Sequence, residues 1–336
     1  MAFPDSAIRI AVDAMGGDHA PDVVVEGAVA AVKEYPGTQV VLVGDEARIV
    51  SLLKKAKYAG PDISISAASE VIEMCESPAN SVRRKRDSSI VVGVNLVKEG
   101  KADAFFSAGN TGAVVCAATL SLRLLPGVER PGIGIIMPSL KGISLLIDVG
   151  ANIDPKPVQL LQYGIMADVY MRCILNKPSP TVGLLNIGEE ESKGTDFVKE
   201  TYELFEKSHL NFIGNVEGRD LFSGKSDIIV CDGFVGNVAL KVSESVAEAM
   251  QIFLKRHLKS NPLGLLGALL LKTSFSRFKK DIDYAEYGGA PLLGVDGVVV
   301  IGHGRSSAKA IKNAIRVSKE EVERKFNELI TEAVKH

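Results

Sequence analysis

A glycine-rich segment at residues 107–112, Ser-Ala-Gly-Asn-Thr-Gly, carries the clearest sign of chemistry in this 336-residue chain. An apolar strand is expected directly before it, and an apolar helical pattern follows at once. Glycines at such a junction let backbone N–H groups point outward, and the start of the helix adds a partial positive charge. Gly109 and Gly112 would supply such amides, while Asn110 and Thr111 add side-chain donors. The segment therefore predicts an uncharged cradle for phosphate.

A second junction of the same kind, Asp-Gly-Phe-Val-Gly-Asn, occupies residues 232–237 after another apolar strand. One glycine junction is explained as well by the fold as by function, because every α/β protein turns strands into helices. Two matching Gly-Asn junctions favour the interpretation that they form a functional site. Asn237 would ordinarily cap the helix that follows Gly236. Its amide could also donate to a carbonyl oxygen that gains negative charge.

Two further loops offer polar side chains. Lys193 lies between an expected strand and helix, flanked by Gly188 and Gly194, where it could neutralise a phosphate or a developing oxyanion. The alternative is a solvent-exposed loop lysine, although the preceding three glutamates would hold it in place. His303 lies between two glycines after a buried strand, with Ser306 close by. General acid, phosphate ligand and simple turn residue are equally open for this histidine.

Several familiar catalytic signatures are missing from the sequence. It has no nucleophile elbow, no Walker phosphate loop and no dinucleotide fingerprint after the first strand. No cysteine has a histidine nearby in the sequence, and carboxylates and histidines do not cluster at metal-ligand spacing. We therefore expect no cofactor, no metal and no protein nucleophile. Phosphate itself would be the attacking substrate.

Composition narrows the class of protein. The 39 basic and 41 acidic residues nearly balance, so nothing indicates a nucleic-acid partner. The four cysteines have no zinc-like spacing, and the N-terminus lacks the apolar stretch of a signal peptide. These features predict a reduced, cytoplasmic protein.

Strand and helix patterns alternate along the chain, which predicts a single α/β domain over residues 1–336 with a largely parallel sheet. Ligands of such sheets bind outside the carboxyl ends of the strands. The loops after the strands are therefore expected to leave one edge and converge on one crevice. They are residues 13–19, 107–112, 148–152, 187–194, 232–237 and 302–306.

The segment at residues 254–280 differs from the rest, because an apolar run with basic flanks lies at its centre. The run is far too short to span a bilayer, which takes about 20 residues. A basic-flanked apolar helix can lie in a membrane interface. A subunit interface or a buried core helix explains it equally well, and one surface could serve two roles. The candidate membrane residues are Leu263, Leu265, Leu266, Leu269 and Leu270.

A strongly basic run, Arg83, Arg84, Lys85 and Arg86, follows a Ser-Pro pair. Most such runs form a solvated helix face. The alternative is docking of an acidic protein or of a phosphorylated carrier.

These motifs together resemble a known family. Residues 13–18, 107–113, 148–152, 232–237 and 287–294 are similar to the motifs of the bacterial phosphate acyltransferase (PlsX) family, in the same order. The resemblance implies a homodimeric three-layer α/β/α enzyme, similar in fold to isopropylmalate dehydrogenases and phosphotransacetylases, with a protruding helical hairpin. It implies transfer of a fatty acyl group from acyl carrier protein to inorganic phosphate, and peripheral association with the inner face of the cell membrane. The acyl phosphate would serve phospholipid synthesis and pass to a downstream glycerol-3-phosphate acyltransferase.

Within the family pattern, Lys193 and Asn237 match the residues expected to be essential. We expect residues 109–112 and 303–306 to hold phosphate while Lys193 and Asn237 stabilise the thioester oxyanion. A thioester is activated enough for orientation and charge stabilisation to carry the step. The rival hypotheses are a short-chain phosphotransacetylase that uses coenzyme A, a nucleotide-linked dehydrogenase and a membrane-binding scaffold.

Overall fold

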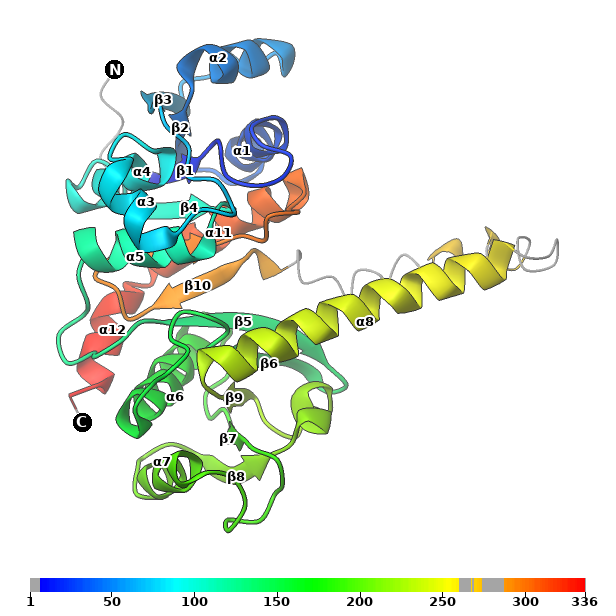
Figure 1. Cartoon of the computed structure of the whole chain (residues 1–336). Helices are drawn as coiled ribbons and strands as arrows, with labels where there is room; N and C mark the ends of the chain where they lie inside the picture. Colours follow the sequence, from blue (N-terminus) through cyan, green and yellow to red (C-terminus); the bar gives the residue numbers. More distant parts are fainter. Residues whose placement is uncertain (1–6, 260–266, 268, 274–286, 336) are drawn as a thin grey trace.

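The computed structural model describes residues 7–259, 267, 269–273 and 287–335. Its described residues form one 11-stranded sheet with the strand order β3-β2-β1-β4-β11-β10-β5-β6-β9-β7-β8. Helices cover both faces of the sheet (Figure 1). Parallel pairing dominates, and antiparallel pairing is confined to the β11-β10-β5-β6 region at the centre. The predicted α/β class with a mostly parallel sheet is confirmed.

The first half of the sheet contains the strands from β3 to β11, and the helices that connect them flank it. Its elements are β1 (Ile8–Asp13), α1 (Asp22–Glu34), β2 (Thr38–Gly44), α2 (Glu46–Lys55), β3 (Ile63–Ala67), α3 (Pro78–Arg84), α4 (Ser89–Lys98), β4 (Ala104–Ser107), α5 (Thr111–Ser121), β11 (Val298–Ile301) and α11 (Ala308–Glu323). Buried apolar residues of α1 and α11 pack on one face of this half. Those of α4 and α5 pack on the other.

The second half contains the remaining strands, and buried apolar residues of α6 and α7 pack against it. Its elements are β5 (Gly132–Ser139), β6 (Gly142–Ile147), α6 (Pro157–Cys173), β7 (Val182–Leu185), α7 (Asp196–Glu206), β8 (Phe212–Val216), the 3-10 turn η1 (Gly218–Phe222), β9 (Ile228–Val230), α8 (Gly233–Lys259), β10 (Ala290–Leu293) and α12 (Phe326–Ala333). β10 therefore comes late in the chain but lies in the middle of the sheet.

The two halves point in opposite directions, so the expectation of a single carboxyl edge is wrong. β10 pairs antiparallel with both β11 and β5, and β5 pairs antiparallel with β6. The parallel strands β6, β9 and β7 consequently run opposite to β1, β4 and β11. Loops that follow strands of the two halves therefore leave the sheet on opposite sides.

The register at the centre nevertheless brings the carboxyl ends of β11 and β6 together. Ile301 ends β11 and pairs with Ala290, the first residue of β10. Ile147 ends β6 and pairs with Gly134 of β5. The residue before Gly134 in β5 pairs with Leu292 of β10, two residues after Ala290. The two strand ends are thus nearly level and about 14 Å apart, since three strand spacings of about 4.8 Å separate them. The loops after β11 and β6 therefore begin close to each other at the centre of the sheet, a region that we call the central seam.

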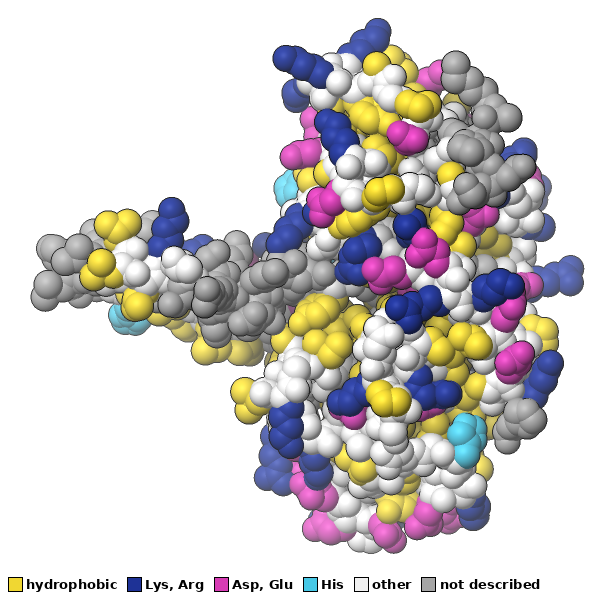
Figure 2. Space-filling view, turned by 180° about the vertical axis from the view of Figure 1, so that it is seen from behind, with side chains coloured by type: hydrophobic (Ala, Val, Ile, Leu, Met, Phe, Trp, Pro, Cys, Tyr) yellow, Lys and Arg dark blue, Asp and Glu magenta, His cyan; other side chains and the backbone are white. Residues whose placement is uncertain are grey.

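Helix α8 begins beside the seam and extends away from the sheet (Figure 1). Its start is packed tightly, because a Cβ atom on Gly236 would lie 1.9 Å from the carbonyl oxygen of Asp148. Further along, large apolar side chains are exposed, and Figure 2 shows hydrophobic groups on the protruding arm. The exposed apolar side chains of α8 include Val238, Val242, Val246, Met250 and Phe253.

The predicted membrane element is described only in part. Leu263, Leu265 and Leu266 lie outside the described residues, as does most of the second arm of the expected hairpin. Leu269 and Leu270 are helical, with 68% and 77% of their surface exposed. Among the helices of the described ranges, none is long and apolar enough to cross a bilayer.

Candidate active site

The phosphate cradle predicted after β4 is shaped by a buried carboxyl group. The Ser107 hydroxyl donates to Asp13 Oδ2 at 2.7 Å and accepts the backbone N–H of Gly109 at 3.0 Å. Burial raises the pKa of Asp13, and hydrogen bonds from Ser89, Ser107 and nearby amides oppose that rise. A Cβ atom on Gly16 would lie 2.7 Å from the backbone nitrogen of Gly109. The loops after β1 and β4 therefore fit against each other backbone to backbone.

Asn110 serves the frame of this cradle. Its Oδ1 atom caps α5 by accepting the N–H of Ala113 at 3.0 Å. Its Nδ2 atom donates to the carbonyl oxygens of Glu73, Met74 and Glu76 at 3.1, 3.2 and 3.1 Å. The amide donors expected to bind phosphate are thus committed to a neighbouring loop. The backbone N–H groups of Thr111 and Gly112, in the first turn of α5, have no acceptor within the helix and can meet an anion.

The loop that carries His303 lies beside this cradle. β11 is the parallel neighbour of β4, and the Gly302 N–H donates to the Ser107 carbonyl at 2.8 Å. The N–H of Arg305 donates to His303 Nδ1 at 3.1 Å, and the N–H of Ser306 donates to the His303 carbonyl at 2.9 Å. Residues 109–112 and 303–306 thus leave adjacent strands on the same side.

The second Gly-Asn junction is organised by another buried aspartate. Asp148 accepts backbone N–H groups from four residues: Ile133, Gly150, Ala151 and Asn152, at 2.9, 3.1, 3.0 and 2.7 Å. Burial raises its pKa, and these amides counteract the rise. The Asn152 carbonyl then accepts the N–H of Gly233, the first residue of α8, at 2.9 Å. The carboxyl end of β6 is thereby fixed to the start of α8.

Asn237 is not the cap of α8. Asp232 takes that role, because its Oδ1 atom accepts the N–H groups of Phe234 and Val235 at 3.0 and 2.9 Å. The side chain of Asn237 lies against the loop after β6, since a Cβ atom on Gly150 would be 3.6 Å from its Nδ2 atom. The ordinary explanation for an asparagine at this junction therefore does not apply.

The Lys193 loop follows β7, the parallel neighbour of β9, so this loop and the first turns of α8, which carry Asn237, follow adjacent strands. The expectation that the preceding glutamates hold Lys193 is wrong for two of them. Glu189 pairs with Arg219 and Lys225 at 3.2 and 3.0 Å, and Glu191 accepts a hydrogen bond from Tyr202 at 3.1 Å. Lys193 itself is exposed.

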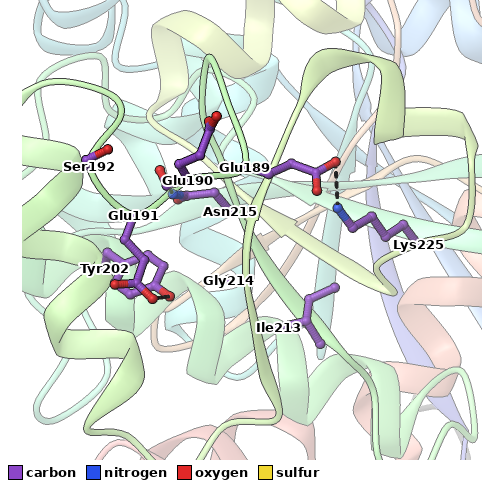
Figure 3. Close-up of a pocket in the computed structure, with 9 residues that line it drawn as sticks. All are labelled: Glu189, Glu190, Glu191, Ser192, Tyr202, Ile213, Gly214, Asn215 and Lys225. Atoms are coloured by element: carbon purple, nitrogen blue, oxygen red, sulfur yellow. Dashed lines mark hydrogen bonds and ion pairs between the residues drawn. The ribbon is translucent and has the colours of Figure 1, made fainter.

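Two hollows lie near these loops. The larger, about 650 Å³, opens between the Lys193 loop and β8 and is lined by glutamates, Asn215 and Lys225 (Figure 3). The smaller, about 390 Å³, lies on α8 and combines the polar side chains of Asn237, Lys241 and Ser245 with three valines. Within the described ranges, no three His, Cys, Asp or Glu side chains group so as to hold a metal ion.

The three arginines of the basic run differ from its lysine in their surroundings. Arg83, Arg84 and Arg86 are exposed, and no carboxylate of the described residues lies within ion-pair distance of their guanidinium groups. Lys85 is different, because its ammonium group pairs with Glu76 and donates to the Val71 carbonyl at 2.7 Å. Lys85, aided by hydrogen bonds from Ser81 and Glu73, lowers the pKa of Glu76 to about 2. Three of the four basic residues therefore remain available for docking.

Residues 8–329 match the model of a family described as fatty acid synthesis protein. The chain belongs to this family. A phosphate acyltransferase of Geotalea uraniireducens is 51% identical over 97% of this chain and 94% of its own. One from Desulfitobacterium hafniense is 52% identical over 96% of each chain. The resemblance noted from the motifs is confirmed.

Two solved structures with other names have a similar fold. A phosphotransacetylase from Streptococcus pyogenes superposes with a TM-score of 0.65 at 18% identity, covering 95% of this chain and 94% of its own. A branched-chain phosphotransacylase from Enterococcus faecalis gives 0.54 at 15% identity, covering 94% and 99%. At these identities the likeness concerns the fold alone.

Proposed function

We propose that the protein transfers a fatty acyl group from the thioester of acyl carrier protein to inorganic phosphate. The Lys241 ammonium nitrogen of α8 lies 3.4 Å from His303 Nε2, in the loop after β11. This contact carries the proposal, because it links two glycine junctions, the one at the start of α8 and the one after β4, the neighbour of β11. One, at residues 109–112, presents backbone amides suited to phosphate, and the other presents Asn237 with no capping role. Membership of a family with phosphate acyltransferase members supports the same reaction.

In the proposed step a phosphate oxygen attacks the thioester carbonyl carbon and forms the new C–O bond. The C–S bond then breaks, and the carrier's sulfur leaves as a thiolate that takes up a proton from solvent. Amides at residues 109–112 and the 303–306 loop hold the phosphate, whereas Lys193 and Asn237 stabilise the oxyanion that forms on the carbonyl oxygen. The product, an acyl phosphate, is a mixed anhydride that a downstream glycerol-3-phosphate acyltransferase can consume.

Replacing the oxyanion donors tests this assignment. We expect Lys193→Ala and Asn237→Ala each to lower kcat about 10²-fold or more, which is the usual loss for one oxyanion donor. Acyl-phosphate formation from palmitoyl carrier protein is the measurement. Lys207→Ala and Asn211→Ala are exposed matched controls that should keep normal turnover. Near-normal kcat in both site variants would refute the assignment.

We propose that Arg83, Arg84 and Arg86 bind the carrier protein. These residues lie on the same half of the sheet as His303 and the phosphate cradle. Carrier proteins are acidic, so exposed guanidinium groups without carboxylate partners complement them. Lys85 is left out because its pairing with Glu76 gives it a structural role.

Charge reversal separates carrier docking from catalysis. The triple variant Arg83→Glu, Arg84→Glu and Arg86→Glu should raise the KM for palmitoyl carrier protein about tenfold, while kcat stays close to normal. The reversal of Arg48, Lys54 and Lys55 on α2, three exposed residues, is the control for net charge. Parallel assays with palmitoyl coenzyme A and acetyl coenzyme A distinguish a short-chain phosphotransacetylase. An unchanged KM for the carrier thioester would exclude this surface.

We further propose that the exposed apolar face of α8 pairs with the same face of a second copy, giving a homodimer. Val246, which also lines the smaller hollow, and Met250 lie on this face beyond Lys241, with 52% and 65% of their surface exposed. Water-exposed valine and methionine side chains in a row are stabilised by burial against a like surface. In sedimentation velocity the wild type should behave as a dimer of 35.8 kDa chains, and Val246→Glu with Met250→Glu as a monomer. A dimer that survives both changes contradicts this interface.

The apolar run beyond α8 is proposed as a peripheral anchor on the inner face of the cell membrane. Leu269 and Leu270 are exposed and helical, and lysines and arginines flank the run in the sequence. We expect Leu269→Glu with Leu270→Glu to abolish co-sedimentation with phosphatidylglycerol vesicles. Leu140→Glu, at an exposed leucine between β5 and β6, should leave it unchanged. Equal vesicle binding by wild type and the double variant would exclude the anchor.

A further inference from the structure

Helix α8 joins the two loops of the seam through a cluster of charged side chains. Asn237 lies against the loop after β6, and Lys241 follows it one turn along the same helix. The Lys241 ammonium nitrogen is 3.4 Å from His303 Nε2, in the loop after β11. Both Asn237 and Lys241 line the 390 Å³ hollow. Lys241 therefore lies between Asn237, which is proposed to stabilise the oxyanion, and His303, whose loop is proposed to hold phosphate.

The hydrogen bond to the other ring nitrogen fixes what His303 can do. The backbone N–H of Arg305 donates to His303 Nδ1 at 3.1 Å, so that nitrogen carries no proton. The neutral imidazole then has its proton on Nε2, which is a donor. Lys241 and His303 Nε2 are consequently two donors that face the same point, and they cannot hydrogen-bond to each other.

Among the residues that the structure describes, Glu244 occupies the place where an anion would satisfy both donors. Glu244 accepts from Lys241 at 2.9 Å, and its Oε2 atom is 3.6 Å from His303 Nε2. Burial raises the pKa of Glu244, but hydrogen bonds from His303 and Lys241 outweigh that effect and hold the pKa below its usual range. The carboxylate is therefore ionised, and the pair of donors already stabilises a negative charge.

We propose that Lys241 is a further phosphate-binding residue, that His303 Nε2–H is its partner, and that Glu244 is the internal counter-charge with which the phosphate competes. This inference rests on the proposed function and deepens it. The attacking phosphate carries one to two negative charges at neutral pH, so charged donors would strengthen its binding beyond the amides of residues 109–112. Charge-assisted hydrogen bonds from an ammonium group supply them.

Substitutions of Lys241 and Glu244 are expected to change the KM for phosphate in opposite directions. Lys241→Gln should raise the KM for inorganic phosphate about tenfold or more, because it removes a charged donor, and the KM for the thioester should stay within twofold. Glu244→Gln keeps an acceptor for Lys241 but removes the negative charge, so the KM for phosphate should fall several-fold. Lys241→Arg should retain most of the affinity for phosphate. Lys55→Ala, at an exposed lysine of α2, is the matched control.

A purely structural cluster would respond differently, since both substitutions would then weaken the site in the same direction. An unchanged phosphate KM in Lys241→Gln, or a raised one in Glu244→Gln, overturns the proposal. The Glu244→Gln arm remains decisive if Lys241→Gln does not fold, as judged by its thermal melting. Wild-type enzyme that forms no acyl phosphate from any thioester would instead refute the proposed function.

Discussion

The reversal of strand direction at β10 is the constraint on which the rest of the structure depends. A sheet of uniformly parallel strands would place every loop with chemistry along one edge, spread over many strand spacings. Here the antiparallel pairings of β10 with β11 and β5 turn the second half around, and the register sets Ile147 almost level with Ile301. The carboxyl ends of two half-sheets thereby meet about 14 Å apart, three strand spacings across. A substrate between them can contact loops from two independently built halves.

Each half holds its central loop with a buried aspartate at the end of a strand. Asp13 organises the loops after β1 and β4 through Ser107, and Asp148 binds four backbone amides around the end of β6. Burying a carboxylate costs free energy unless hydrogen bonds replace those that it made to water. A loop that supplies these hydrogen bonds is therefore held in the conformation that forms them. Rigid loops are what a reaction without a covalent intermediate requires, because catalysis then depends on orientation.

Much of this arrangement could be predicted from local patterns. The apolar helical spacing of residues 22–34, ended by a Pro-Gly pair, is typical of a helix such as α1, and the apolar residues 104–107 are typical of a strand such as β4. The local pattern does not predict helices α3 and α4 or strand β10. α3 is short and polar, and β10 contains Pro291, which is unfavourable in the middle of a sheet. Without β10 the change of direction could not be foreseen. The partners of Asn110 and of Glu189 depend on contacts between segments far apart in the sequence, which no local pattern encodes.

The packing of Gly236 on the Asp148 carbonyl gives α8 the properties of a rigid spacer. A helix of 27 residues is about 40 Å long, and its inner end is fixed to the seam with no room for a side chain. If its outer end rests on an anionic bilayer, the site can stand off from the lipid headgroups by up to that length. The surface potential of such a bilayer decays over about 8 Å at physiological ionic strength, and it repels phosphate within that layer. The spacer would then let the enzyme take phosphate at its bulk concentration while the protein stays bound to the membrane.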